Sequence, residues 1–73
     1  MKNLTPKILD KLFEDFAIKY GFNTPELTEI RTIMGKLNID SEKRAQKLAQ
    51  IIFEENLIKL PSDEIITLVK DRL

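Results

Sequence analysis

Apolar residues recur at helical spacing in four segments of this chain, and a helix-start signal precedes each segment. The signals are Thr5-Pro6, Thr24-Pro25, Asp40-Ser41 and Pro61-Ser62-Asp63-Glu64. Thr, Ser or Asp at a helix N-cap accepts a hydrogen bond from a free amide of the first turn, and Pro fits there because its missing N–H would be unpaired anyway. The pattern predicts an all-α fold, a single domain over residues 1–73 built as a compact bundle of four short helices at about 6–20, 25–37, 41–58 and 62–72.

The first segment carries signals at both of its ends. Leu4 and Leu9 have the spacing of a hydrophobic staple around the Thr5 cap. Gly21 follows the last apolar position and supplies the left-handed residue that ends many helices, while Phe22 can fold back over the last turn. We therefore expect this helix to begin and end close to the predicted residues.

The expected core consists of the residues that share the main apolar face of each predicted helix. These residues are Leu9, Leu12, Phe13, Phe16, Ile30, Ile33, Leu37, Leu48, Ile52, Phe53, Ile65, Leu68 and Val69.

Four apolar residues lie off these faces and form a hypothetical protein interface. Ile18 projects among charged residues of the first segment, and Ile51 and Ile58 form a second ridge on the third segment. Phe22 lies between the first two segments. The alternative is that Phe22, Ile51 and Ile58 complete the core and that Ile18 is a single exposed apolar residue, which is common in soluble proteins.

Residues 57–70 admit two structures. As a helix, the segment would have Ser62 at its N-cap, acidic residues in the first turn, and Lys70 and Arg72 in the last turn, in agreement with the helix dipole. As a β-hairpin, its β-branched residues 65–69 would pair with residues 57–60 across a turn. Capping and charge favour the helix.

The composition offers little catalytic chemistry. The chain has no His, Cys or Trp, its two glycines form no phosphate-binding loop, and adjacent acidic pairs such as Glu54-Glu55 diverge on a helix. We expect no enzyme activity, no cofactor and no metal. Twelve basic residues balance twelve acidic ones, and no apolar run is longer than three residues. A membrane span needs about 20 such residues, so we expect a cytoplasmic protein without a membrane partner.

Residues 33–40, Ile-Met-Gly-Lys-Leu-Asn-Ile-Asp, resemble the second helix and turn of a helix-turn-helix DNA-binding domain. Asn38 stands at the turn position, where the family often has Gly. The resemblance implies that residues 41–55 are a recognition helix with Ala45, Leu48 and Ile52 buried. Its outward side chains, of types that contact phosphates and base edges, would be Lys43, Arg44, Gln46, Lys47 and Gln50. A hairpin at 57–70 would extend the likeness to a winged helix.

Charge argues against the DNA-binding alternative, because such domains usually have a pI above about 9 and this chain has a sequence pI of 6.2. We therefore expect a small non-enzymatic protein–protein interaction or regulatory module. Its partner would be another protein or a second copy of the chain, and we expect no small-molecule substrate. A small helix-turn-helix DNA-binding protein is the alternative.

Overall fold

Four α-helices and two short 3₁₀ turns make up the fold in the computed structural model, which describes residues 4–73. The helices are α1 (Pro6–Tyr20), α2 (Thr24–Lys36), α3 (Glu42–Glu54) and α4 (Ser62–Val69), and the 3₁₀ turns are η1 (Leu57–Lys59) and η2 (Lys70–Arg72). No strand occurs in residues 4–73, so the all-α prediction is confirmed and the hairpin alternative for residues 57–70 is wrong. None of the helices in this part of the chain has the length and apolar character needed to cross a membrane.

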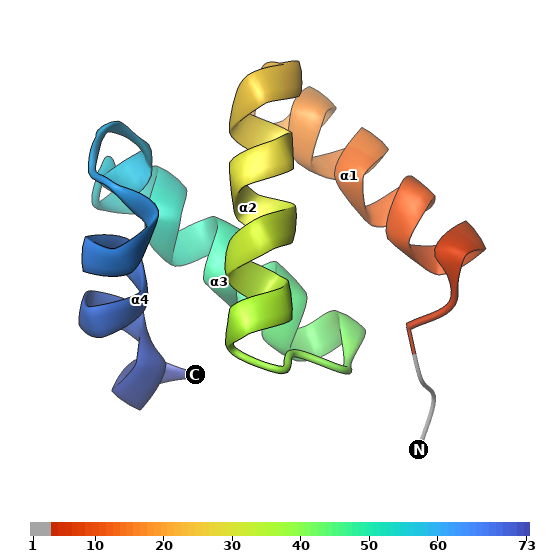
Figure 1. Ribbon diagram of the computed structural model, residues 1–73. Coiled ribbons are helices and arrows are strands. Elements are labelled where there is room, and N and C mark those ends of the chain that lie inside the picture. Colours follow the sequence, from red (N-terminus) through yellow and green to blue (C-terminus); the bar gives the residue numbers. More distant parts are fainter. Residues whose placement is uncertain (1–3) are drawn as a thin grey trace.

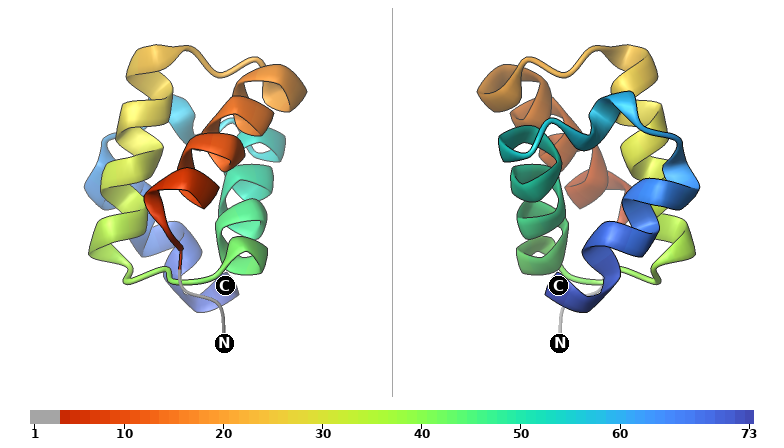
Figure 2. Two further views of the ribbon diagram at one scale, coloured as in Figure 1. Left: turned by 90° about the vertical axis from the view of Figure 1, so that its right-hand side faces the viewer. Right: turned by 90° about the vertical axis from the view of Figure 1, so that its left-hand side faces the viewer.

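α1 and α4 lie on opposite sides of the molecule, with α2 and α3 between them (Figure 1). Each of the two outer helices packs against both α2 and α3. Contacts between α2 and α3 themselves are fewer. The two side views show how α1 crosses one face of the molecule and α4 crosses the other (Figure 2).

The helix starts follow the predicted signals with two corrections. The Thr5 and Ser41 hydroxyls accept hydrogen bonds from amides three residues on, as expected of N-caps. The second helix is capped by Asn23 instead of Thr24: the Asn23 side chain accepts from the Glu26 amide, and the Glu26 carboxylate accepts from the Asn23 amide. A capping box satisfies two free donors at once, which explains why the start moves by one residue.

The fourth helix starts where the sequence predicts, but Ser62 is not its cap. Pro61 occupies the cap position and offers no side-chain hydrogen bond. The Ser62 hydroxyl instead donates to the Glu29 carboxylate at 3.2 Å, which joins the start of α4 to α2.

A left-handed residue follows the end of each of the first three helices. Gly21 ends α1 at φ 72°, as predicted, and Asn38 takes φ 54° in the turn after α2. α3 ends at Glu54, four residues before the predicted end, because Asn56 adopts φ 53° and the chain then enters η1. Asn tolerates this conformation better than most residues, so it ends the helix without a glycine.

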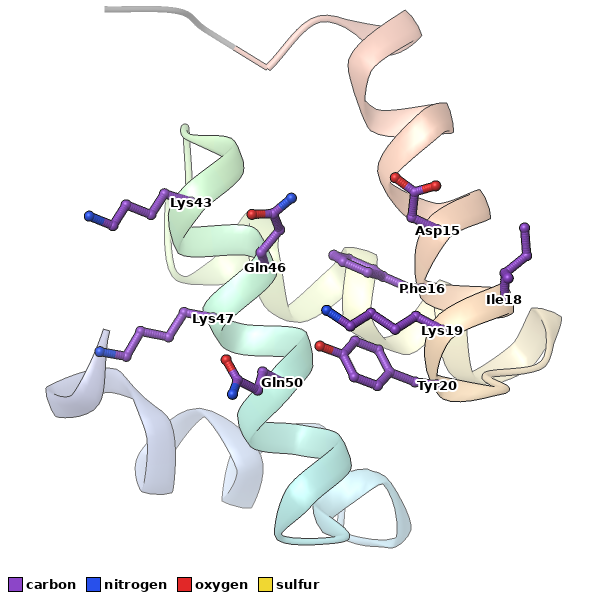
Figure 3. A pocket seen from close by; sticks show the side chains of 9 residues that line it. All are labelled: Asp15, Phe16, Ile18, Lys19, Tyr20, Lys43, Gln46, Lys47 and Gln50. Carbon is purple, nitrogen blue, oxygen red and sulfur yellow. The ribbon is translucent and has the colours of Figure 1, made fainter.

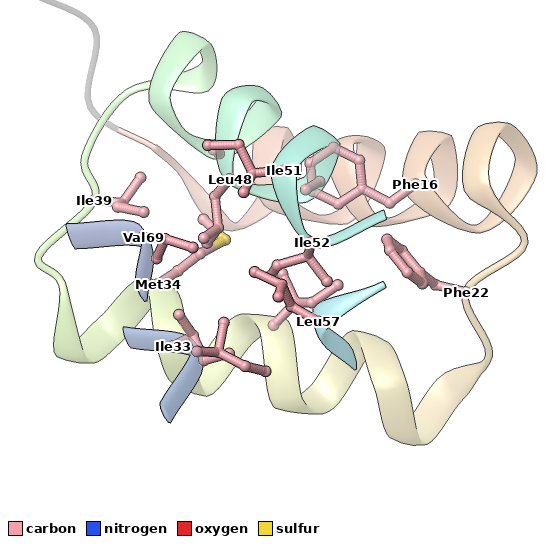
Figure 4. Close-up of a cluster of buried hydrophobic side chains, with 14 of the residues drawn as sticks. Phe16, Phe22, Ile33, Met34, Ile39, Leu48, Ile51, Ile52, Leu57 and Val69 are labelled. Carbon is pink, nitrogen blue, oxygen red and sulfur yellow. The ribbon is translucent and has the colours of Figure 1, made fainter. Parts of the chain in front are cut away.

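One cluster of buried apolar side chains fills the space between the helices (Figure 4). All buried residues in this part of the chain are apolar. Nine predicted core residues are among them: Leu12, Phe13, Phe16, Ile30, Ile33, Leu48, Ile52, Ile65 and Val69. The predicted Leu9 and Leu37 are partly buried against the same cluster.

Two predicted core residues lie outside the core. Phe53 is 48% exposed and Leu68 is 49% exposed. Phe53 packs at the edge of the core, with its ring centroid 4.9 Å from that of Tyr20. α4 buries Ile65 and Val69, which are one helical turn apart, and this leaves Leu68 on its outer side.

Candidate binding groove between α1 and α3

A groove of about 690 Å³ lies between α1 and α3. From α3 it is lined by Lys43, Gln46, Lys47 and Gln50. These residues form two pairs at i and i+4, so each pair lies along one side of the helix. Figure 3 shows the two glutamines nearer to α1 and the two lysines extending along the outer side of α3.

The α1 side of the groove adds charge and apolar surface. Its lining residues are Asp15, Phe16, Ile18, Lys19 and Tyr20. Lys19 and Tyr20 point from α1 towards α3 (Figure 3), so the glutamine pair lies between lysines on both sides. The Lys19 ammonium lies 5.4 Å from the centre of the Tyr20 ring, a distance that permits a cation–π interaction.

The groove carries an excess of positive charge. Its lining includes three lysines and one acidic residue, Asp15, whose carboxylate lies 3.9 Å from the Lys11 ammonium. No carboxylate of residues 4–73 lies within 4 Å of the ammonium of Lys19, Lys43 or Lys47. The three ammonium groups are therefore available to an anionic ligand.

Most of the predicted nucleic-acid residues meet in this groove. Lys43, Gln46, Lys47 and Gln50 line it, but Arg44 does not. The Arg44 residue is partly buried, and its amide donates to the Ser41 hydroxyl at the start of α3.

The predicted protein interface is not formed as one surface. Phe22 and Ile51 are each 7% exposed and belong to the core, and Phe22 also lines a small surface hollow together with Ile58. Ile58 is partly buried against the same core. Ile18 is 78% exposed and lies at the α1 edge of the groove. A helical wheel of α3 alone cannot show that Ile51 is buried, because other elements of the fold cover the ridge that Ile51 forms.

Sequence reasoning missed the contributions of Lys19 and Tyr20. Both belong to α1, and their place beside α3 follows from how the two helices pack, which no local pattern encodes. Phe53 was also missed as a surface residue: with Tyr20 it forms an aromatic pair close to the end of the groove.

Within residues 4–73, no three acidic side chains come close enough together to hold a metal ion. Comparisons of the chain with protein-family models, with curated proteins and with solved structures gave no significant match.

Proposed function

We propose that this protein is a small non-enzymatic interaction module whose α1–α3 groove binds an acidic, partly apolar segment of a partner protein. The observation that carries the proposal is the set of three lysines, free of ion pairs among residues 4–73, around Gln46 and Gln50 in the α1–α3 groove. An acidic helix with carboxylates at i and i+4 would match the spacing of Lys43 and Lys47.

Apolar groups at the α1 side favour a protein partner. Ile18 is largely exposed, and the Tyr20 ring borders the groove. An apolar side chain of the partner would bury these surfaces, whereas a phosphate backbone would not. The formal net charge of the chain is zero, which also favours a protein over DNA.

A selection experiment tests the proposal. A random peptide library would be selected on the wild-type protein and, in parallel, on Lys43→Glu/Lys47→Glu. We expect peptides that bind only the wild type to be enriched in Asp and Glu with at least one large apolar residue. Lys59→Gln, which removes an exposed charge outside the groove, serves as the control and should bind these peptides unchanged.

The size of the effect follows from exposed ion pairs, which contribute about 0.2–1 kcal/mol each. Replacing Lys43 or Lys47 alone by Gln should weaken binding of a selected peptide by about 1.4- to fivefold, and raised salt should weaken it further. Enriched peptides without excess acidic residues, or equal binding to the wild type and the double variant, would contradict the proposal.

DNA is the second candidate, because four outward residues of α3 in this groove are of types that contact phosphates and bases. Titration of a labelled duplex at low salt tests it. Salt-sensitive duplex binding that is lost in Lys43→Glu/Lys47→Glu, together with no acidic peptides in the selection, would favour DNA.

A further inference from the structure

The outer side of α4 has a character opposite to that of the groove. Asp63, Glu64, Thr67 and Leu68 line a shallow hollow of about 480 Å³, which we call the α4 edge. Two carboxylates stand in its first turn, and the half-exposed Leu68 lies one turn further along. The Glu29 carboxylate is nearby because it accepts the hydrogen bond of Ser62.

One lysine of the same chain forms an ion pair at the α4 edge, and both partners of the pair remain exposed to solvent. The Lys36 ammonium lies 3.6 Å from the Asp63 carboxylate, but the two side chains remain 55% and 89% exposed. Glu64 takes part in no ion pair among residues 4–73. Asp63 and Glu64 can therefore still reach cations of another molecule.

The α4 edge shares negative charge and an exposed apolar residue with the partner segment of the proposed function, although its carboxylates, Asp63 and Glu64, are adjacent and not at i and i+4. It is a helix with adjacent carboxylates in its first turn and an exposed apolar residue at the next turn. The groove offers Lys43 and Lys47 from α3, Lys19 from α1, and the exposed Ile18. α1 and α4 lie on opposite sides of the molecule (Figure 1), so a copy cannot place its own α4 edge in its own groove.

We propose that the α1–α3 groove of one copy binds the α4 edge of a second copy. This inference rests on the proposed function of the groove and names its partner. Because the two surfaces differ, the contact is head-to-tail and leaves one free groove and one free edge at the ends of each assembly. Such contacts make open chains or rings, not a two-fold dimer. Both hollows are shallow and charged, so the association should be weak and should depend on salt.

Sedimentation equilibrium of two complementary variants tests the inference. Lys43→Glu/Lys47→Glu blocks the groove and keeps the edge, and Asp63→Lys/Glu64→Lys blocks the edge and keeps the groove. The average mass of the wild type should rise with concentration up to roughly 1 mM and fall at high salt. Each variant alone should stay at the 8.5 kDa of one chain. An equimolar mixture should associate, because the intact edge of the first variant meets the intact groove of the second, and it can grow beyond 1:1 because the two reversed surfaces again carry opposite charges.

Lysines at a helix N-terminus oppose the helix dipole and can destabilise the fold of Asp63→Lys/Glu64→Lys. A milder variant is therefore needed to separate loss of the contact from loss of folding. Leu68→Ser keeps every charge and should weaken self-association while circular dichroism stays unchanged. Lys59→Gln is the control outside both surfaces and should associate as the wild type does.

Three results would overturn the inference: a wild type that stays monomeric at about 1 mM and low salt, self-association that persists in both variants, or a mixture of the two variants that does not associate. The peptide selection separates this failure from failure of the proposed function. Acidic peptides bound in the groove of a monomeric protein would leave the groove's function intact and show that its partner is another protein. A groove that binds neither peptides nor a second copy would end both proposals.

Discussion

The two glycines of the chain allow one substitution to be tested in two backbone conformations. Gly21 ends α1 at φ 72°, whereas Gly35 lies in the last turn of α2 without a positive φ. A Cβ atom built on either residue meets no other atom within 4 Å. Replacement by Ala therefore introduces no clash at either position, and only the backbone conformation distinguishes the two variants.

The expected effects have opposite signs. Gly35→Ala should stabilise the protein by about 0.5–1 kcal/mol, because Ala loses less backbone entropy in a helix. Gly21→Ala forces Ala into the left-handed region at a cost of about 1–2 kcal/mol, of which the less flexible unfolded chain offsets about 0.4–1 kcal/mol. In a domain of this size 1 kcal/mol moves the Tm by about 4–8 °C. The two variants should thus differ by roughly 2–20 °C.

Thermal unfolding followed by circular dichroism, with urea unfolding as a second measure, checks this prediction. Gly21→Asn is the matched control, since Asn accepts left-handed angles and should recover part of the loss. A fall in Tm for Gly35→Ala, or a rise for Gly21→Ala, would refute the assigned backbone conformations.

Three further predictions concern capping, burial and pH. Asn23→Ala should lower the free energy of unfolding by about 1 kcal/mol in urea unfolding, because it removes the α2 capping box. Thr24→Ala should lower it by less than about 0.5 kcal/mol. Equal losses in the two variants would contradict the assignment of Asn23 as the N-cap. Ile52→Ala should cost about 2–5 kcal/mol, since Ile52 is fully buried, and a loss below about 1 kcal/mol would contradict that burial. The hydrogen bonds and charge of Arg72 lower the pKa of Glu55. The pair therefore stabilises the fold fully when the pH is above the pKa of Glu55 in the unfolded chain, and this stabilisation is lost as the pH falls through the lower pKa of Glu55 in the folded chain. The Tm difference between the wild type and Arg72→Ala should therefore shrink below about pH 4, and a constant difference would exclude this linkage.

Local signals were sufficient to predict the helices, and their limits explain the errors. α1 agrees at both ends because Thr5 and Gly21 act within single turns. At α2, Asn23 and Thr24 are both of types that cap a helix. The reciprocal hydrogen bonds between Asn23 and Glu26 make Asn23 the N-cap. At the end of α3, Asn56 gives a weaker stop signal than a glycine would. The helical form of residues 62–69 agrees with the acidic first turn of the segment against its β-branched composition, although the predicted Ser62 cap is not formed.

The burial of individual residues was harder to predict, because a helical wheel shows one helix and no neighbours. Ile51 belongs to the core since α3 contacts α1 on one side and α4 on another. Phe53 has the spacing of a core residue but lies where the neighbouring helices do not cover it. The groove illustrates the same limit: the α3 residues could be predicted as a set from their common face, while Lys19 and Tyr20 joined them only through tertiary packing.

The way α1 and α4 each pack against both α2 and α3 has a consequence for how the chain divides. A cut in the turn at Asn38 would separate α1 and α2 from α3 and α4, and the contacts of α1 with α3 and of α2 with α4 all cross that cut. Neither fragment would keep enough apolar burial to stay folded alone. Mixed together, the two fragments should restore the helices of the intact chain. The protein is thus suited to fragment complementation, and nascent chains that lack α4 should remain without a completed core.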